Sequence, residues 1–209
     1  MRSLHSIGPA VGRTFRLRRL FLLIALLLIS LFAGSCSTSS DDIASRVSDY
    51  YSGLTTMNVL VDMTAEFDDY SVDFELGFQY NANGQSYIEV RKPDEIKGIR
   101  VLFRDDGIDI EYEGVSLETG LSENSSISPA GALPELLRVW IGGMASEQGK
   151  ERIDGIDCLM VTHTATRNGV ELQYNTWFDA ENLKPVKAEI FENGYRKICC
   201  DFLIAEKFE

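Results

Sequence analysis

Histidine and cysteine are scarce in this chain of 209 residues, which contains two histidines and four cysteines. His163 is the only histidine after the first 35 residues, and no Cys-x-x-Cys pair occurs. Because a zinc site needs several such ligands at short spacing, we expect no metal. The Gly-x-Ser-x-Gly turn of serine hydrolases is also missing. We therefore predict no cofactor and no enzymatic activity, and interpret His163 as a hydrogen-bonded strand residue; an enzyme that uses His163 is a weaker alternative.

Basic residues are few, with 20 Lys and Arg against 32 Asp and Glu. The first 35 residues hold five of the basic residues and no acidic one, so the rest carries 15 against 32 and a net charge of −17. Nucleic-acid binding needs clustered Lys and Arg, and adsorption to anionic lipid needs the same. Both are excluded as electrostatic functions, whereas a basic protein partner would be complementary.

Only one long apolar run occurs, from Leu20 to Phe32, and it follows four arginines. Thirteen helical residues span about 20 Å, less than the hydrocarbon core of about 30 Å, so a signal peptide is favoured over a transmembrane helix. The run ends in Ala-Gly-Ser-Cys at 33–36, which resembles the bacterial lipobox. That resemblance implies cleavage after residue 35 and diacylation of Cys36. The alternative is an ordinary secretory signal with Cys36 as a spare thiol.

The sequence therefore divides into three parts. We predict a lipoprotein signal peptide at 1–35, a polar tether at 36–42 and one domain at 43–209. The protein is then exported and anchored through Cys36 to the outer face of the cytoplasmic membrane, because two acyl chains give stable membrane attachment. The sequence leaves open whether the chain forms a dimer.

The remaining cysteines are Cys158, Cys199 and Cys200, an odd number. Neighbours on a strand point to opposite faces, so only one of Cys199 and Cys200 would face the core. We interpret the three as buried apolar residues, with one disulfide from Cys158 to Cys199 or Cys200 as an alternative.

Hydrophobic periodicity predicts a mainly β (α+β) domain. A helical pattern covers 41–53, and alternation of apolar and polar residues then predicts strands near 57–65, 71–80, 87–91, 99–104 and 108–113. A second helix at 133–141 follows, with Pro134 in its first turn and Gly142-Gly143 at its end. Five further strands follow near 150–154, 156–166, 170–179, 185–192 and 195–204, two of the turns being Asn-Gly hairpins. About ten antiparallel strands would form a single large curved sheet with the helices on its apolar concave face.

The stretch 115–132 is rich in Ser and Gly and is predicted as a loop that gates the concave face. The carboxylates at Asp105, Asp106, Asp109 and Glu111 do not match an EF-hand, so we interpret them as a solvated hairpin turn.

Three short stretches resemble motifs of the LolA/LolB-like lipoprotein carrier superfamily: residues 90–93 (VRKP), 106–112 (DGIDIEY) and 177–186 (WFDAENLKPV). The resemblance implies an incomplete antiparallel β-barrel, LolA-like, with an N-terminal helix and a lid helix on the concave face. It also implies a carrier of hydrophobic ligand. An anchored clostridial branch, similar to the germination lipoprotein GerS, implies instead an interaction protein that binds and regulates a cell-envelope enzyme such as a cell-wall amidase.

Apolar residues on the expected concave face define the candidate ligand site. We predict that a lipid or acyl chain binds between the sheet and the helix at 133–141, against Met57, Val59, Val61, Phe74, Leu76, Phe78, Leu133, Leu137 and Trp140. The same residues would equally make an ordinary core that fills itself. The two function hypotheses are thus a hydrophobic-ligand binding module and an envelope interaction protein.

Overall fold

A computed structural model describes residues 40–104, 107–118 and 127–206, all within one compact unit, Ser40–Glu209. The predicted signal peptide, Cys36 and most of the tether lie outside the described residues. So do residues 119–126 of the predicted gating loop.

In the described ranges, two α-helices and one short 3-10 helix accompany the strands. The first, α2 (Ser40–Ser52), matches the predicted helix within a residue. The second, α3 (Pro129–Gly142), begins four residues before the predicted start. Ser128 caps α3, its hydroxyl oxygen accepting a hydrogen bond from the Gly131 N–H at 3.1 Å. The 3-10 helix η1 covers Asp94–Ile96.

The prediction that Pro134 lies in the first turn of its helix is wrong. Pro129 takes the first helical position, where a missing N–H costs nothing, and Pro134 lies inside α3. At this position Pro134 cannot donate to the carbonyl of Ala130, so burial of the apolar side of α3 must compensate for that hydrogen bond. Gly143 ends the helix as predicted, its N–H donating to the Val139 carbonyl at 2.8 Å.

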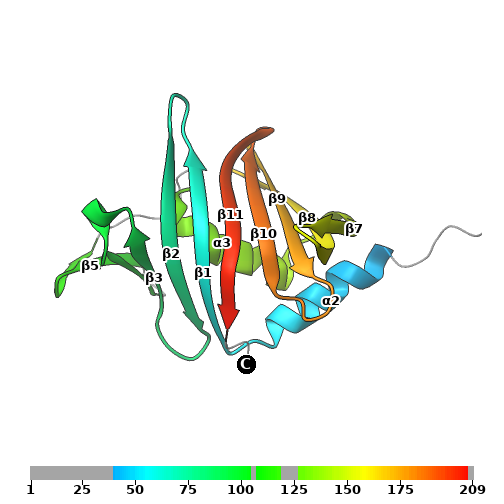
Figure 1. Cartoon of the computed structure of the whole chain (residues 1–209), viewed down its shortest axis with the longest axis horizontal. Helices are drawn as coiled ribbons and strands as arrows, with labels where there is room; N and C mark the ends of the chain where they lie inside the picture. Colours follow the sequence, from blue (N-terminus) through cyan, green and yellow to red (C-terminus); the bar gives the residue numbers. More distant parts are fainter. Residues whose placement is uncertain (1–39, 105–106, 119–126, 207–209) are drawn as a thin grey trace, which may run out of the picture. The chain divides into compact units, whose positions relative to one another are not determined.

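The strands form a single antiparallel sheet. They are β1 (Thr56–Glu66), β2 (Ser71–Asn81), β3 (Ser86–Lys92), β4 (Arg100–Arg104), β5 (Gly107–Tyr112), β6 (Val115–Glu118), β7 (Ala145–Ile153), β8 (Ile156–Arg167), β9 (Val170–Asp179), β10 (Pro185–Glu192) and β11 (Tyr195–Glu206). Their order is β6-β5-β4-β3-β2-β1-β11-β10-β9-β8-β7, so the first and last strands pair at the centre and the sheet stays open at β6 and β7 (Figure 1). This confirms the predicted fold class.

Two details of the predicted strand pattern are wrong. The sheet has eleven strands because residues 115–118 form β6, which pairs with β5 across a turn at Glu113 and Gly114. β7 also begins at Ala145, five residues before the predicted start. The start of β7 was not predicted because this edge strand is rich in charged residues and lacks clear alternation of apolar and polar side chains.

The Asn-Gly turns are confirmed as hairpins. Asn168 and Gly169 have φ of 52° and 80°, and Asn193 and Gly194 have φ of 51° and 81°. Two consecutive positive φ values are what a two-residue hairpin turn requires, and Asn and Gly adopt them at the lowest cost.

Both helices pack on one face of the sheet, which we call the inner face; we call the opposite face the outer face. Val47 and Tyr51 of α2 and Leu133, Leu136 and Trp140 of α3 join the buried side chains of the strands in one cluster. In Figure 1 the sheet is seen from its outer face, with α3 running behind the strands. The core therefore lies between the inner face and the two helices.

Candidate functional site

Strand pairing places the inner-face side chains in continuous rows. Val61 of β1 pairs with Leu76 of β2, Leu76 pairs with Val90 of β3, and Val101 of β4 pairs with Ile110 of β5. Because side chains alternate along a strand, each row keeps the same face of the sheet. The inner face is thus apolar across strands far apart in sequence.

Of the nine residues predicted to bind ligand, eight are buried in the core cluster: Met57, Val59, Val61, Leu76, Phe78, Leu133, Leu137 and Trp140. The ninth, Phe74, is half-buried and packs against the cluster. The structure therefore places eight of them in one core cluster and the ninth against it. A ligand among them would have to displace α3 or its side chains.

Inner-face residues become more exposed from the centre of the sheet toward β6. Val61 and Leu76 are buried and Ile110 is half-buried, while Tyr112 at the end of β5 is 43% exposed and Val115 of β6 is 61% exposed. Tyr112 and Val115 are direct cross-strand partners. The apolar surface therefore extends beyond the core. These residues were not predicted as site candidates, although Ile108, Ile110 and Tyr112 alternate with acidic neighbours.

An aromatic cluster joins both helices to the central and C-terminal strands. The ring centroid of Trp140 lies 4.9 Å from that of Tyr51, 5.3 Å from that of Phe178 and 6.0 Å from that of Phe202. The polar ends are satisfied: the Trp140 indole N–H donates to the Thr176 hydroxyl at 2.9 Å, and the Tyr51 hydroxyl donates to the Leu183 carbonyl at 2.8 Å. Such contacts fix the orientation of α2 and α3 on this half of the inner face.

A carboxylate holds α3 to strands β8 and β9. Glu135 Oε1 accepts hydrogen bonds from the Tyr174 hydroxyl at 2.9 Å and from Arg167 Nη2 at 3.0 Å, and Arg138 on the same helix adds two bonds. Burial alone would raise the pKa of Glu135, but the hydrogen bonds from Arg138 and Tyr174 and the charges of Arg138 and Arg167 lower it. Burial and the Glu135 charge raise the pKa of Tyr174. The cluster was not predicted, because its members lie far apart in sequence.

His163 is a buried inner-face residue, 4% exposed, beside the C-terminus of α3. Its Nδ1 has no hydrogen-bond partner among the described residues, so the interpretation as a strand histidine hydrogen-bonded in place is wrong for this atom. Burial lowers the pKa of His163 to about 4, which favours the neutral form at physiological pH. A general base needs access to substrate, and this imidazole is enclosed.

No set of three or more metal-ligating side chains close enough to hold an ion occurs in the described part of the chain. Asp105 and Asp106 of the carboxylate turn lie outside it. Asp109 forms an ion pair with Arg104 at 2.6 Å. Its carboxylate therefore neutralises a cation of the protein itself.

The structure contradicts a disulfide between Cys158 and Cys199 or Cys200, because all three cysteines are free. Cys158 lies on β8 and the other two on β11, with β9 and β10 between them. Three strand spacings amount to roughly 14 Å, about twice the largest Cα separation that a disulfide spans. Cys158 and Cys200 are buried, as expected for small apolar residues.

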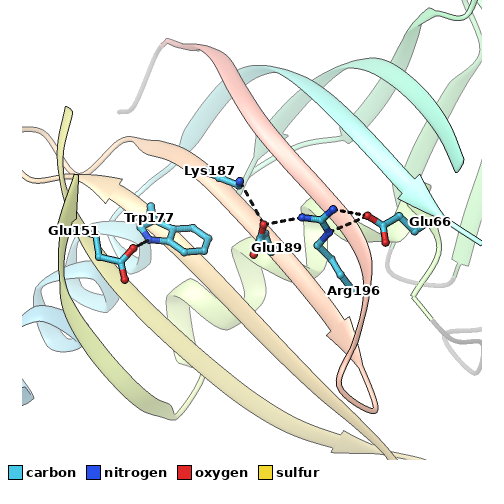
Figure 2. Close-up of polar contacts among 6 residues, drawn as sticks. All are labelled: Glu66, Glu151, Trp177, Lys187, Glu189 and Arg196. Atoms are coloured by element: carbon cyan, nitrogen blue, oxygen red, sulfur yellow. Dashed lines mark hydrogen bonds and ion pairs between the residues drawn. The ribbon is translucent and has the colours of Figure 1, made fainter. Parts of the chain in front are cut away.

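A set of ion pairs and hydrogen bonds lies on the outer face of β9, β10 and β11 (Figure 2). Arg196 donates to Glu66 Oε1 at 2.6 and 2.9 Å and to Glu189 at 3.2 Å, and the Lys187 ammonium lies 3.4 Å from Glu189. The Trp177 indole N–H donates to Glu151 at 2.7 Å. No described helix covers these residues, so their ion pairs face solvent and stabilise the sheet only weakly.

The described elements form an open antiparallel sheet with an apolar inner face partly covered by two helices. Neither described helix is long and apolar enough to cross a membrane.

No family model matches the sequence, and no curated protein matches it. The fold is similar to several solved structures. The lipoprotein LppX of Mycobacterium tuberculosis has a TM-score of 0.43 and 18% identity, with 82% of this chain and 100% of LppX covered. A LolA superfamily protein of Nitrosomonas europaea has a TM-score of 0.42 and 14% identity over 79% of this chain and 94% of its own. The complex of the Clostridioides difficile CwlD amidase with the GerS lipoprotein gives a TM-score of 0.36 and 15% identity, over 82% of this chain and 97% of the matched one.

Proposed function

We propose that this chain is an exported lipoprotein, anchored through Cys36, that binds a hydrophobic ligand on its inner face without catalysing a reaction. The ligand class is a lipid or an acyl chain. The observation that carries the proposal is the apolar surface that continues past the core to Tyr112 and Val115, exposed at 43% and 61%. An inner face that served only as a core would need no such extension.

The ligand is proposed to lie along β4, β5 and β6. Phe103 and Ile108 are cross-strand partners that pack at the border of the core, and Val101 and Ile110 form the next pair. An acyl chain laid over these pairs gains about 0.8 kcal/mol for each methylene that it buries. Phe74 is the least buried of the nine predicted ligand residues.

The proposal is tested by titrating the purified full chain with a fluorescent fatty acid, 11-dansylaminoundecanoic acid. The double substitution Tyr112→Lys/Val115→Lys places two charges on exposed inner-face positions, where they cost folding little. We expect its affinity for the probe to fall at least tenfold. The matched control is Ile204→Lys, an exposed apolar residue of the outer face, which should bind as the unsubstituted chain does.

Absence of binding by the unsubstituted chain would overturn the proposal and favour the second hypothesis, an envelope interaction protein. Equal loss of affinity in both variants would also overturn it, because the probe would then bind through charge-sensitive adsorption and not at the inner face. Native mass spectrometry of the chain from its own host is an independent check, since a carrier is expected to retain a lipid-sized mass.

A further inference from the structure

The outer face has an apolar patch at the centre of the sheet, where β1 pairs with β11. Leu60 pairs with Ile204 and Val61 pairs with Phe202, so Leu203 is an extra residue in a β-bulge. Phe202 packs against the core, whereas Leu203 and Ile204 are 52% and 45% exposed. We call Leu60, Leu203 and Ile204 the bulge patch. Both helices belong to the inner face, and no described element covers the patch.

Two carboxylates border the bulge patch. Asp62, two residues beyond Leu60 on the same face of β1, is the direct cross-strand partner of Asp201 on β11. Both side chains belong to exposed residues. Like charges at directly opposed positions of a sheet repel each other and destabilise it. This pair is therefore not explained by the stability of the sheet.

The two lysines in the same cross-strand row as Asp62 and Asp201 form ion pairs with other carboxylates. In the same cross-strand row Lys187 follows Asp201, but its ammonium lies 3.4 Å from Glu189. Lys92, at the other end of the row, lies 2.6 Å from Glu75. Both ammonium groups have longer-range electrostatic interactions with the aspartates, yet among the described residues neither Asp62 nor Asp201 forms an ion pair within 4 Å.

We propose that the bulge patch and the Asp62–Asp201 pair together form a docking surface for a basic protein partner. The partner presents an aliphatic side chain to Leu60, Leu203 and Ile204, and a Lys or Arg to the two carboxylates about 7 Å away along β1. Apolar contact supplies affinity, and the cation removes the repulsion that the free chain tolerates.

Charge selects this occupant over two others. An anionic membrane surface is repelled by carboxylates. A second copy related by a two-fold axis would bring the same carboxylates face to face, because such an interface uses the same patch on both subunits. The bulge patch is separate from the proposed ligand site, which lies on the opposite face of the sheet.

The binding test uses the purified full chain and three labelled eight-residue peptides, (Lys-Leu)4, (Glu-Leu)4 and (Lys-Ser)4, measured by fluorescence anisotropy at low and high salt. We expect (Lys-Leu)4 to bind most tightly, and its affinity to fall at least fivefold with Asp62→Asn/Asp201→Asn and with Leu203→Ser/Ile204→Ser. The control, Asp49→Asn/Glu181→Gln, makes the same charge change at exposed positions on α2 and in the β9–β10 turn, and should leave binding unchanged. Equal binding of all three peptides, or equal losses with test and control variants, would overturn the proposal.

A second measurement separates docking from a structural role. Asp62→Asn/Asp201→Asn should raise the urea midpoint of unfolding while it weakens binding of (Lys-Leu)4, because repulsion is removed together with the charge. A lowered midpoint would overturn the assignment of the pair to a partner. A chain that ends at Glu206 is the last control. If only that shortened chain bound the peptide, the chain's own final residues would be the occupant and a separate partner would be excluded.

Discussion

Trp140 on α3 donates its indole N–H to the hydroxyl of Thr176 on β9 at 2.9 Å, and both residues are buried. A helix that covers an apolar face is held mostly by apolar packing, which depends little on orientation. This hydrogen bond is specific, because its distance and angle are met only when α3 has one rotation about its axis and one position along β9. The pair therefore reports whether α3 is seated on the inner face.

The substitution Thr176→Val keeps the shape of the side chain but removes the acceptor. The buried indole N–H then has no partner, which should lower the free energy of unfolding by about 1–3 kcal/mol. Thr164→Val, at an exposed position of β8, is the control and should change it by less than about 0.5 kcal/mol. In a urea-unfolding cycle with Trp140→Phe, we expect the double variant to lose less than the sum of the single losses. Strict additivity would show that the two groups do not interact.

The Glu135 cluster should make stability depend on pH in the acid range. Because the pKa of Glu135 is lowered in the folded chain, its ionised form stabilises the fold above the unfolded pKa. This contribution is lost as the pH falls through the folded value. Glu135→Gln should therefore cost about 1–2 kcal/mol at pH 7 and much less at pH 3. Urea unfolding at both pH values measures the difference, with exposed Glu181→Gln as control. A cost that is equal at pH 3 and pH 7 would contradict the role of the charge.

His163 predicts a second and separable pH effect. Its pKa is lowered from 6.5 to about 4 by burial, so the unfolded chain takes up a proton before the folded one does. Stability is then fully present above pH 6.5 and declines as the pH falls toward 4, by about 3 kcal/mol at most. His163→Leu should remove this decline while keeping that of Glu135. The measurement is the free energy of unfolding of the unsubstituted chain and of His163→Leu between pH 7 and pH 4. If both free energies fall by the same amount over this range, His163 does not titrate in it.

Thiol reactivity tests whether Cys158 forms a disulfide with Cys199 or Cys200. Denatured without reductant, the chain should show free thiols at Cys158, Cys199 and Cys200. In the folded chain, half-buried Cys199 should react with Ellman's reagent first, since Cys158 and Cys200 are buried. Burial also raises the pKa of Cys200 and so lowers its thiolate fraction. Cys199→Ser should abolish the fast phase. Loss of two thiols in the denatured chain would contradict the three free cysteines of this structure.

The local patterns of the sequence predicted most of the fold because they depend on neighbouring residues. Alternation in β2 and the Asn-Gly turns at 168–169 and 193–194 are readable within a few positions. β6 and the start of β7 were missed because they lie at the edges of the sheet, where one face or both remain polar and the alternation weakens. Pro134 was misplaced because the true cap, Ser128, lies in a segment whose composition resembles a loop.

The candidate site was predicted less well than the fold. The nine proposed residues do come together, since apolar residues of one parity share a face. Which of them remain accessible depends on where α3 ends over the sheet, and no local pattern encodes that. The Glu135–Tyr174–Arg167 contacts and the bulge at Leu203 depend on tertiary position and strand register. Neither can be read from spacing.

The pairing of β1 with β11 has a consequence for the order of folding. Their register joins Asn58 to Glu206 and Ala65 to Ile198, so the middle of the sheet is made by the two strands farthest apart along the chain. Closing so long a loop carries a large entropic cost that local hairpins do not share. Until the last strand is available, the hairpins of β1–β6 and of β7–β10 are two separate half-sheets. Loss of β11 would thus divide the molecule at its centre and not trim it at an edge.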